Sequence, residues 1–280
     1  MTLAEKCDRL LDLLRSLGSC AVAYSGGVDS AVVAKAARLA LGDKALAVTG
    51  VSNSLASGEL EIAREIAARI GIRHEVIETN EFANPAYLRN ASDRCYHCKT
   101  ELYTQMEGMQ ERFGVAAVVN GANADDAGDY RPGMKAASEH EVRSPLLELG
   151  ITKDEVRALA AEWELPVWDK PASPCLSSRV AYGEEVTPER LRMIDGAEQL
   201  LRELGLREVR VRYHKGDLAR IEAPLEALPR LASDEVRRLL AARLTELGFR
   251  FVTLDLAGFR SGSLNTLISS DALLSAHKPK

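Results

Sequence analysis

The sequence contains no apolar run of 18 residues, so we expect no membrane span. Its first residues lack a basic segment followed by an apolar one, so we expect no secretory signal and a cytoplasmic location. Basic residues are not in excess, because 36 Lys and Arg stand against 41 Asp and Glu. A net charge of −5 does not favour nucleic acid as the main partner. In a cytoplasmic chain the five cysteines favour metal ligands, reactive thiols or core residues over disulfides.

Two common phosphate-binding patterns are also absent, the Gly-Lys-Ser/Thr ending of a Walker loop and Gly-x-Gly-x-x-Gly. Instead, an apolar run at 20–24 breaks into Ser-Gly-Gly-Val-Asp-Ser at 25–30, and a helix-compatible stretch follows. A strand, a glycine turn and a helix start present backbone N–H groups and a positive helix end to an anion. Ser25 and Ser30 add hydroxyl donors, and Asp29 can hold the Mg²⁺ that accompanies a polyphosphate.

The first part of the chain alternates between expected helices and strands. Helices are predicted over 5–17, 30–41, 57–70, 100–113 and 151–164, and strands over 20–24, 45–49, 74–77 and 115–119. Ser57 and Gly71 are the expected ends of the third helix, and Thr152 and Glu155 form an expected capping box. The alternation indicates an α/β fold, with a mostly parallel sheet wrapped by helices and ligands at the carboxyl ends of its strands.

The pattern changes after residue 188. A helix over 189–204, strands over 208–213 and 218–223, a helix over 234–247 and a strand over 249–254 indicate a small α+β domain, of ferredoxin-like type. We place the domain boundary near residue 183. Residues 1–183 then form the sheet domain that carries the cysteine loops, 184–268 form the α+β domain, and 269–280 form a poorly ordered tail.

Three cysteines fall in expected loops. Cys95 and Cys98 form a C-x-x-C pair outside any clear strand or helix, and Cys175 lies in a Pro- and Ser-rich loop over 166–178. Such a pair can be a redox centre, half of a zinc site or part of an iron–sulfur site. Zinc needs a fourth ligand, which would have to be His140, whereas three thiolates suit a four-iron cluster with one open iron. Plain thiols remain a third interpretation. Core packing explains the remaining two, Cys7 and Cys20.

Two arginines alternate along one expected strand. Arg210 and Arg212 face the same side of 208–213, which suits bidentate binding of a phosphate. The alternative is a solvated polar face, with Val209 and Val211 packed inside.

Further charged candidates lie in loops. Asp125 and Asp126 follow Gly121 at a strand end, where they could contact a nucleotide or magnesium or could simply cap the loop. Arg179, four residues after Cys175, is a candidate for the positive charge that favours a thiolate.

These segments together resemble one family. The loop at 25–30 resembles the PP-loop of ATP pyrophosphatases, which cleave ATP between its α and β phosphates. The wider set resembles the LarE family, the ATP-dependent sulfur transferases of nickel-pincer nucleotide cofactor synthesis. The likeness spans roughly residues 5–267. Its segments are Arg-Cys-Tyr-His-Cys-Lys at 94–99, Asn-Gly-Ala-Asn-Ala-Asp-Asp at 120–126, Asp-Tyr-Arg-Pro-Gly at 129–133, Arg-Ser-Pro-Leu at 143–146, Pro-Cys-Leu-Ser-Ser-Arg at 174–179 and Asp-Leu-Ala-Gly-Phe-Arg-Ser-Gly at 255–262.

The resemblance implies a fold of the adenine-nucleotide alpha-hydrolase type, a homo-oligomer, and a pyridinium mononucleotide substrate with two carboxylates. ATP adenylates a carboxylate and releases pyrophosphate, and a sulfur nucleophile then displaces AMP to give a thiocarboxylate. In one branch of the family, the cysteine that matches Cys175 gives up its own sulfur. In another, three cysteines hold a [4Fe-4S] cluster whose open iron carries the sulfide. With Cys95 and Cys98 present, this chain resembles the cluster branch.

The candidate residues form three groups. Expected contacts of ATP and Mg²⁺ are Ala23, Ser25, Gly26, Gly27, Asp29, Ser30, Thr49, Gly121 and Asp125. Expected contacts of the pyridinium substrate are Arg131, Ser177, Ser178, Arg179, Arg210 and Arg212. The expected sulfur donor is Cys175, and the expected cluster ligands are Cys95, Cys98 and Cys175. The alternatives are a tRNA-thiolating enzyme, an amide-forming synthetase of the NAD or GMP type, and a nucleotide sensor or cluster carrier without catalysis.

Overall fold

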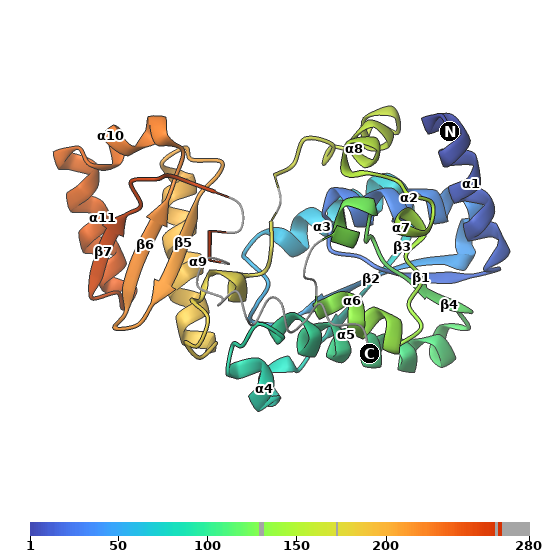
Figure 1. Cartoon of the computed structure of the whole chain (residues 1–280), viewed down its shortest axis with the longest axis horizontal. Coiled ribbons are helices and arrows are strands. Elements are labelled where there is room, and N and C mark those ends of the chain that lie inside the picture. The colour runs from blue at the N-terminus through green and yellow to red at the C-terminus, as the bar shows by residue number, and fades with distance from the viewer. Residues whose placement is uncertain (129–131, 172, 261–262, 265–280) are drawn as a thin grey trace. The chain divides into compact units, whose positions relative to one another are not determined.

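The computed structural model describes residues 1–128, 132–171, 173–260 and 263–264, which divide into two compact units (Figure 1). Unit 1 consists of Met1–Ser52, Ser57–Glu81 and Cys95–Ser173, and unit 2 consists of Asn53–Ala56, Phe82–Arg94 and the chain from Pro174 on. The chain therefore passes from unit 1 to unit 2 for the last time after Ser173. The sequence pattern suggests a boundary about ten residues later, near residue 183. Two short stretches from the first hundred residues also belong to unit 2.

A parallel sheet in the order β3-β2-β1-β4 forms the centre of unit 1, as the α/β prediction requires. Its strands are β1 (Cys20–Ala23), β2 (Ala45–Val51), β3 (Arg73–Glu78) and β4 (Ala117–Val119). The chain first builds the sheet outward through β2 and β3, and then returns to place β4 on the other side of β1. This reversal makes the carboxyl ends of β1 and β4 a topological switch point, where sheets of this class bind ligands.

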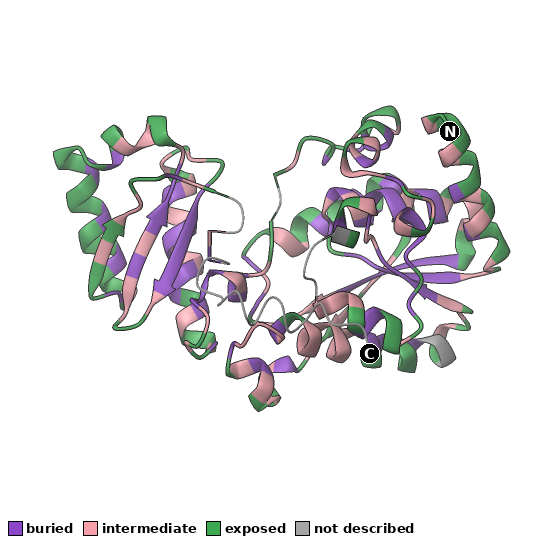
Figure 2. Ribbon diagram, viewed as in Figure 1, coloured by how far each residue is buried: buried purple, intermediate pink, exposed green. Residues whose placement is uncertain are grey.

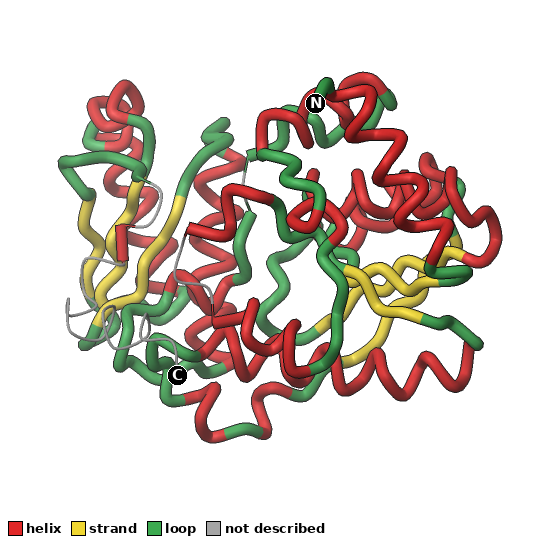
Figure 3. The backbone as a smooth tube through the Cα atoms, turned by 45° about the vertical axis from the view of Figure 1, so that its right-hand side comes forward, coloured by secondary structure: helices red, strands yellow, loops and turns green. Residues whose placement is uncertain are grey.

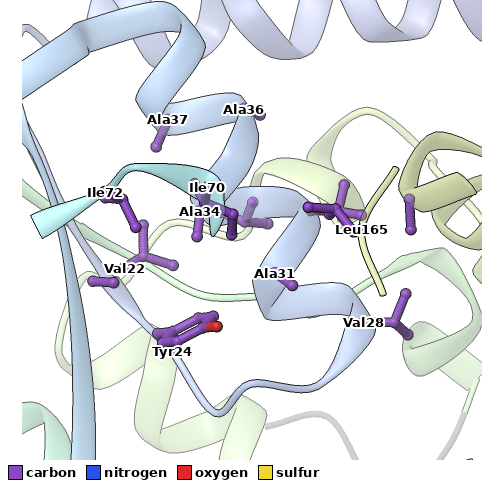
Figure 4. Close-up of a cluster of buried hydrophobic side chains, with 14 of the residues drawn as sticks. Val22, Tyr24, Val28, Ala31, Ala34, Ala36, Ala37, Ile70, Ile72 and Leu165 are labelled. Carbon is purple, nitrogen blue, oxygen red and sulfur yellow. The ribbon is translucent and has the colours of Figure 1, made fainter. Parts of the chain in front are cut away.

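Helices cover both faces of this sheet. Because successive strand residues point to opposite faces, Val22 and Tyr24 pack in one core cluster, whereas Ala21 and Ala23 pack in another (Figure 4 shows part of the first). A strand that is covered on both faces has a continuous apolar sequence, as β1 does. The first cluster includes residues of α1 (Leu3–Ser16), α2 (Val28–Leu41), α3 (Glu59–Ile70) and α8 (Lys153–Glu162), and the second includes residues of α5 (Arg94–Phe113) and α6 (Pro132–Glu139).

The helix ends follow local sequence signals. Thr152 and Glu155 form the expected capping box of α8, and Gly71 ends α3 with a φ of +74°. Ser57 does not cap α3, because Gly58 precedes its first residue. Several short helices lie in the connecting segments. They are α4 (Pro85–Leu88), α7 (Pro145–Glu148), η1 (Gly42–Lys44), η2 (Glu81–Ala83), η3 (Ala124–Gly128), η4 (Leu176–Arg179) and η5 (Leu225–Ala227).

The helix expected over 100–113 begins earlier than the sequence suggests. It starts at Arg94, so Cys95 and Cys98 lie within its first five residues, and the prediction of a cysteine loop at this pair was wrong. The four residues at 95–98 (Cys, Tyr, His, Cys) all have low helix propensity. Helix propensity therefore does not indicate that the helix begins here. The start coincides with burial, because the Arg94 side chain is only 5% exposed.

Unit 2 contains a mixed sheet in the order β5-β6-β7, in which β5 and β6 are antiparallel and β6 and β7 are parallel. The strands are β5 (Arg210–His214), β6 (Leu218–Glu222) and β7 (Phe251–Leu254), and the helices are α9 (Pro188–Glu203), α10 (Leu228–Leu231) and α11 (Asp234–Glu246). Helix α9 contacts β5, α11 contacts β7, and the two helices contact each other, so they cover one face (Figure 3). The expected order of helices and strands is confirmed.

Burial differs between strands within each unit. In unit 1, β1 is buried throughout, whereas β3 has only exposed and half-buried residues. In unit 2, β5 is buried along most of its length, whereas β7 alternates between exposed and half-buried residues (Figure 2). Within the described ranges, no helix is both long and apolar enough to cross a bilayer.

Candidate functional site

The expected phosphate loop joins the carboxyl end of β1 to the start of α2. Gly26 has a φ of +72°, and a Cβ at this position would lie 2.9 Å from the Cβ of Ala63, so the turn requires glycine. Gly27 is the N-cap and contributes no side-chain hydrogen bond to the first turn of α2. The Oγ atoms of Ser25 and Ser30 lie 3.1 Å apart, and the Ser30 hydroxyl donates to the Gly27 carbonyl at 3.0 Å. The first N–H groups of α2 are therefore not occupied by a capping side chain.

The loop after β4 packs directly on this helix start. A Cβ on Gly121 would lie 2.8 Å from the backbone nitrogen of Ser30 and 3.0 Å from the carbonyl carbon of Asp29. Backbone approaches backbone here as closely as glycine permits. The structure thus brings Gly121 and the phosphate loop together at the switch point of the sheet.

Side chains from two other segments contact the carboxylate of Asp29. Its Oδ1 atom accepts a hydrogen bond from the Asn123 side-chain amide at 3.0 Å, and its Oδ2 atom forms an ion pair with the Lys153 ammonium. Asp125 is exposed, and its carboxylate accepts from the backbone N–H of Lys153 at 2.8 Å, at the first residue of α8. Asp126 accepts from the backbone N–H of Asn123 at 3.0 Å. Both aspartates therefore make the loop-capping contacts that the sequence left open as an alternative.

The ends of β1 and β2 are tied together beside the loop. Thr49 is 3% exposed and donates its hydroxyl proton to the Tyr24 carbonyl at 2.8 Å, while the Ala23 backbone pairs with Val48. The Oγ1 atom of Thr49 also lies 2.8 Å from Nε2 of His74. Since a hydroxyl has one proton, His74 must donate to Thr49 from Nε2. Burial and, to a lesser degree, the charge of Arg64 lower the pKa of His74, which favours the neutral ring.

The three candidate cluster ligands are distributed over both units. Cys95 is exposed and Cys98 is half-buried, and their spacing places them on one face of α5 in unit 1. Cys175 is half-buried and precedes η4 in unit 2. In the part of the chain that the structure describes, no three His, Cys, Asp or Glu residues are arranged to hold a metal ion. His140, the fourth ligand of the zinc alternative, pairs with Glu107 at 2.7 Å.

The segment after Pro174 is fixed within unit 2 by its own backbone. The Cys175 carbonyl accepts from the Ser178 N–H at 3.0 Å, the Ser178 hydroxyl at 2.7 Å and the Arg179 guanidinium at 2.9 Å. The Leu176 N–H donates to the carbonyl of Ser54 at 2.8 Å. Ser177 is fully buried, and its hydroxyl lies 2.6 Å from that of Tyr87. These contacts fix the backbone orientation of residue 175.

Arg179 is a positioning residue for this segment. Its guanidinium and the Glu198 carboxylate are both fully buried and form two hydrogen bonds, of 3.0 and 3.2 Å. Glu198 also accepts from Arg202 at 2.8 Å and from the Val211 N–H at 3.2 Å. Because Glu198 balances its charge, Arg179 acts on Cys175 through the backbone carbonyl.

Arg210 and Arg212 are buried, at 8% and 6% exposure, so the solvated-face alternative was wrong. Arg212 donates to the Glu222 carboxylate at 3.0 Å and to the Ser178 carbonyl at 3.1 Å. The Arg210 guanidinium lies over the Phe259 ring, 5.3 Å from its centroid. Burial, followed by the nearby charge of Arg179, lowers the pKa of Arg210 to about 10. Arg131, the remaining arginine candidate, lies outside the described residues.

Sequence reasoning missed two groups at these sites. Lys153 and Asn123, the partners of Asp29, come from distant segments, but Lys153 carried one signal, because a cation in the first turn of a helix opposes the helix dipole. Arg94 was also missed, and its guanidinium donates to the Ser177 carbonyl at 2.8 Å within unit 2. No local pattern marks such a contact.

Comparison with known proteins gives a consistent assignment. A family model described as asparagine synthase matches residues 11–107. An uncharacterized protein of Synechocystis sp. is 47% identical over 267 residues, which cover 95% of this chain and 99% of the relative. The pyridinium-3,5-bisthiocarboxylic acid mononucleotide synthase of Lactiplantibacillus plantarum is 38% identical over 275 residues, which cover 97% and 98%. A tRNA-specific 2-thiouridylase of Azorhizobium caulinodans is 30% identical over 210 residues, but these cover only 61% and 53%.

The likeness to the synthase extends over both units, whereas the likeness to the thiouridylase is partial. The glycine-dependent loop, the close approach of Gly121 and the anchored Cys175 segment all lie within that full-length match. The chain therefore belongs to the family of pyridinium-3,5-bisthiocarboxylic acid mononucleotide synthases, the LarE family.

Proposed function

We propose that this protein uses ATP to adenylate a carboxylate of a pyridinium dicarboxylate mononucleotide, and then replaces AMP with sulfur to give a thiocarboxylate. The observation that carries the proposal is the phosphate loop at the switch point, where Gly121 packs against the start of α2. Full-length similarity to the Lactiplantibacillus plantarum synthase supports the substrate class.

The phosphate loop supports the adenylation step. An oxygen of the substrate carboxylate attacks the α-phosphorus of ATP, the bond from that phosphorus to the bridging oxygen breaks, and pyrophosphate leaves with the electron pair. The N–H groups at the start of α2 stabilise the charge on the leaving group. Mg²⁺ bound with the nucleotide would share that charge. Asp29 is the protein oxygen donor for it, because Mg²⁺ takes its other ligands from phosphates and water.

Three observations support Cys95, Cys98 and Cys175 as ligands of a [4Fe-4S] cluster. Two of the thiols share one face of α5, and the third lies in a firmly anchored segment. Arg94, the residue before Cys95, donates to Ser177, two residues after Cys175, within unit 2. This bond adds to the contacts that hold the segment around Cys175 within unit 2. A bound cluster would supply a sulfide on its open iron as the sulfur donor.

Unit 2 is the proposed substrate-binding and oligomerisation part. Arg210 and Arg212 are buried cations on one strand, and we assign them to the substrate phosphate because a guanidinium can bind phosphate in a bidentate manner. Ser177, Ser178 and Arg179 position residue 175. Arg131 stays a candidate contact from the sequence.

The decisive experiment follows sulfur and pyrophosphate together. Anaerobically purified protein is assayed for iron and acid-labile sulfide, and is then mixed with MgATP and the pyridinium dicarboxylate mononucleotide. We expect close to four irons per chain, and one pyrophosphate and one AMP per thiocarboxylate. Cys95→Ser and Cys98→Ser should lose iron and thiocarboxylate formation but still release pyrophosphate. Cys7→Ser, at a cysteine outside the motif, is the control.

Other outcomes favour other assignments. Full sulfur transfer without iron, together with a loss of one sulfur from the protein mass at Cys175, would favour the sacrificial branch. Full activity of Cys175→Ala would favour an amide-forming synthetase. Pyrophosphate release that depends on tRNA instead of the mononucleotide would favour tRNA thiolation. No substrate-dependent pyrophosphate at all would favour a sensor or carrier.

A further inference from the structure

Glu59, the first residue of α3, holds the chain that leads to Cys175. Its Oε2 atom forms an ion pair with the Lys170 ammonium at 2.7 Å, and its Oε1 atom accepts from the Ser173 hydroxyl at 3.1 Å. These partners lie 111 and 114 residues away in the sequence. All three residues belong to unit 1, and the chain passes to unit 2 directly after Ser173. One carboxylate therefore fixes the place where the chain leaves unit 1.

The chain that Glu59 holds has no regular secondary structure of its own. Between α8 and η4, the residues that the structure describes form turns and irregular chain, with no helix or strand. The Arg157 guanidinium of α8 donates to the Trp168 carbonyl at 2.8 Å, which fixes the first part of this chain. The contact between Glu59 and Ser173 fixes its end. Side-chain contacts therefore determine the course of this chain.

The position of Ser173 limits the position of Cys175, because only Pro174 lies between them. Two peptide links span at most about 7 Å between the first and the last Cα atom. The proline ring also fixes one backbone torsion of this link. The hold of Glu59 on Ser173 therefore limits how far Cys175 can move from the start of α3.

The next turn of α3 packs against the phosphate loop. The Tyr24 hydroxyl, at the start of the loop, donates to the Ala63 carbonyl at 3.1 Å. A Cβ on Gly26 would lie 2.9 Å from the Cβ of Ala63. Glu59 lies four residues before Ala63, which is about one helical turn. The same helix thus contacts the phosphate loop and, one turn earlier, the chain that precedes Cys175.

The effect of a carboxylate on the stability of α3 does not explain these contacts. The positive start of a helix favours any carboxylate in its first turn, and Glu61 lies in the same turn with its side chain exposed. Glu59 instead contacts Lys170 with one oxygen and Ser173 with the other, and its side chain is only 19% exposed. The two glutamates share the effect of the helix start and differ in their contact with the distant chain.

We propose that Glu59 is a positioning residue for sulfur transfer, which holds the chain before Cys175 on the helix that contacts the phosphate loop. The inference rests on the proposed function, in which sulfur replaces AMP on the activated carboxylate. Glu59 touches neither reactant and acts through Lys170 and Ser173. Such an anchor matters because a displacement of about 1 Å between reacting groups can lower a rate by about 10²-fold.

The test compares Glu59→Ala, Ser173→Ala and their double variant with Glu61→Ala as the control. Each protein is mixed with MgATP and the pyridinium dicarboxylate mononucleotide in a single turnover. The amounts of thiocarboxylate and pyrophosphate are measured over time, and the melting temperature is measured for each protein. The ratio of thiocarboxylate to pyrophosphate separates the sulfur step from adenylation, so a general loss of folded protein does not change it.

We expect Glu59→Ala to lower the rate of thiocarboxylate formation relative to pyrophosphate release by about tenfold or more. Ser173→Ala should lower it in the same direction. The double variant should lose no more than Glu59→Ala, because both changes break the same contact. Glu61→Ala should resemble wild type. A ratio for Glu59→Ala within twofold of wild type, or losses that multiply in the double variant, would overturn the proposal.

Failure of the proposed function is distinguishable from failure of this inference. If the wild-type protein releases no pyrophosphate with the pyridinium substrate, the proposed function is wrong. Hydrogen exchange then tests the anchor directly, at the Lys170 N–H that donates to the Val167 carbonyl at 3.1 Å. Glu59→Ala should speed this exchange and Glu61→Ala should not. Equal exchange in the two variants would show that Glu59 does not hold this chain.

Discussion

The start of α2 leaves no room for a side chain on Gly121. A Cβ there would lie 2.8 Å from the Ser30 nitrogen, and the neighbouring atom is backbone, which cannot move aside cheaply. We expect Gly121→Ala to destabilise the protein by about 1–3 kcal/mol, as overpacked sites do. It should also weaken MgATP binding, because the displaced helix start carries the phosphate loop. Urea unfolding and nucleotide titration measure the two effects.

Gly108 provides the matched control. It lies in α5, it is exposed, and a Cβ on it would meet nothing within 4 Å. Gly108→Ala should therefore stabilise the protein by about 0.5–1 kcal/mol through helix propensity. Equal stabilities for the two variants would show that the approach of Gly121 to α2 is not tight.

The buried pair of Arg179 and Glu198 gives a second prediction for a single residue. Arg179→Met leaves Glu198 buried, with Arg202 as its remaining ion-pair partner among the described residues, so we expect a loss of about 3–5 kcal/mol. Arg202 is 35% exposed, and Arg202→Met should lose at most about 1 kcal/mol. Chemical denaturation compares the two. A small loss for Arg179→Met would mean that Arg202 alone can balance Glu198.

Residue types were easier to anticipate than residue partners. The spacing around Asp29 predicted an anion site, because a strand, glycines and a helix start are local features. Its partner Lys153 lies 124 residues away, and only the folded chain brings the two together. The burial of Arg212 was missed for the same reason, since the Glu222 carboxylate and the Ser178 carbonyl that it contacts come from other elements.

At the scale of elements, α8 depends on its capping box. Thr152 Oγ1 accepts from the Glu155 N–H at 3.4 Å, and the Glu155 carboxylate accepts from the Thr152 N–H at 2.9 Å. Thr152→Ala should destabilise the protein by about 1 kcal/mol. Thr2→Ala removes the same kind of cap from α1, where Thr2, Ala4 and Glu5 are exposed, and should destabilise the protein less. Thermal unfolding of both variants checks this, and a larger loss for Thr2→Ala would contradict it.

Most helices and strands were predictable because their signals are local. A continuous apolar run predicted β1, and helix-compatible stretches and a terminal glycine predicted α2 and α3, each to within two residues. The start of α5 was not predictable, because it depends on the burial of Arg94 among residues of a different segment. The division into units was also not predictable. Residues 53–56 and 82–94 belong to unit 2, but their composition does not distinguish them from the neighbouring segments of unit 1.

For the whole molecule, Cys20 reports on unfolding. Burial raises the pKa of its thiol to about 12, which disfavours the reactive thiolate, and the side chain is fully buried. In iron-free protein we expect iodoacetamide to modify exposed Cys95 quickly and Cys20 only after the core of unit 1 opens. Mass spectrometry after timed alkylation follows both sites, and denatured protein is the control. Similar rates at the two sites in native protein would contradict the prediction.

The chain crosses between its units after Ser52, Ala56, Glu81, Arg94 and Ser173. During synthesis, two pieces of unit 2 therefore leave the ribosome long before the chain that completes that unit. The sheet of unit 1 can already form once β4 has emerged, while Tyr87, which is 1% exposed in the finished protein, still awaits its neighbours from residue 174 on. The nascent protein must carry the Tyr87 side chain without these neighbours through translation of the middle of the chain, and we expect chaperones to bind there during this period.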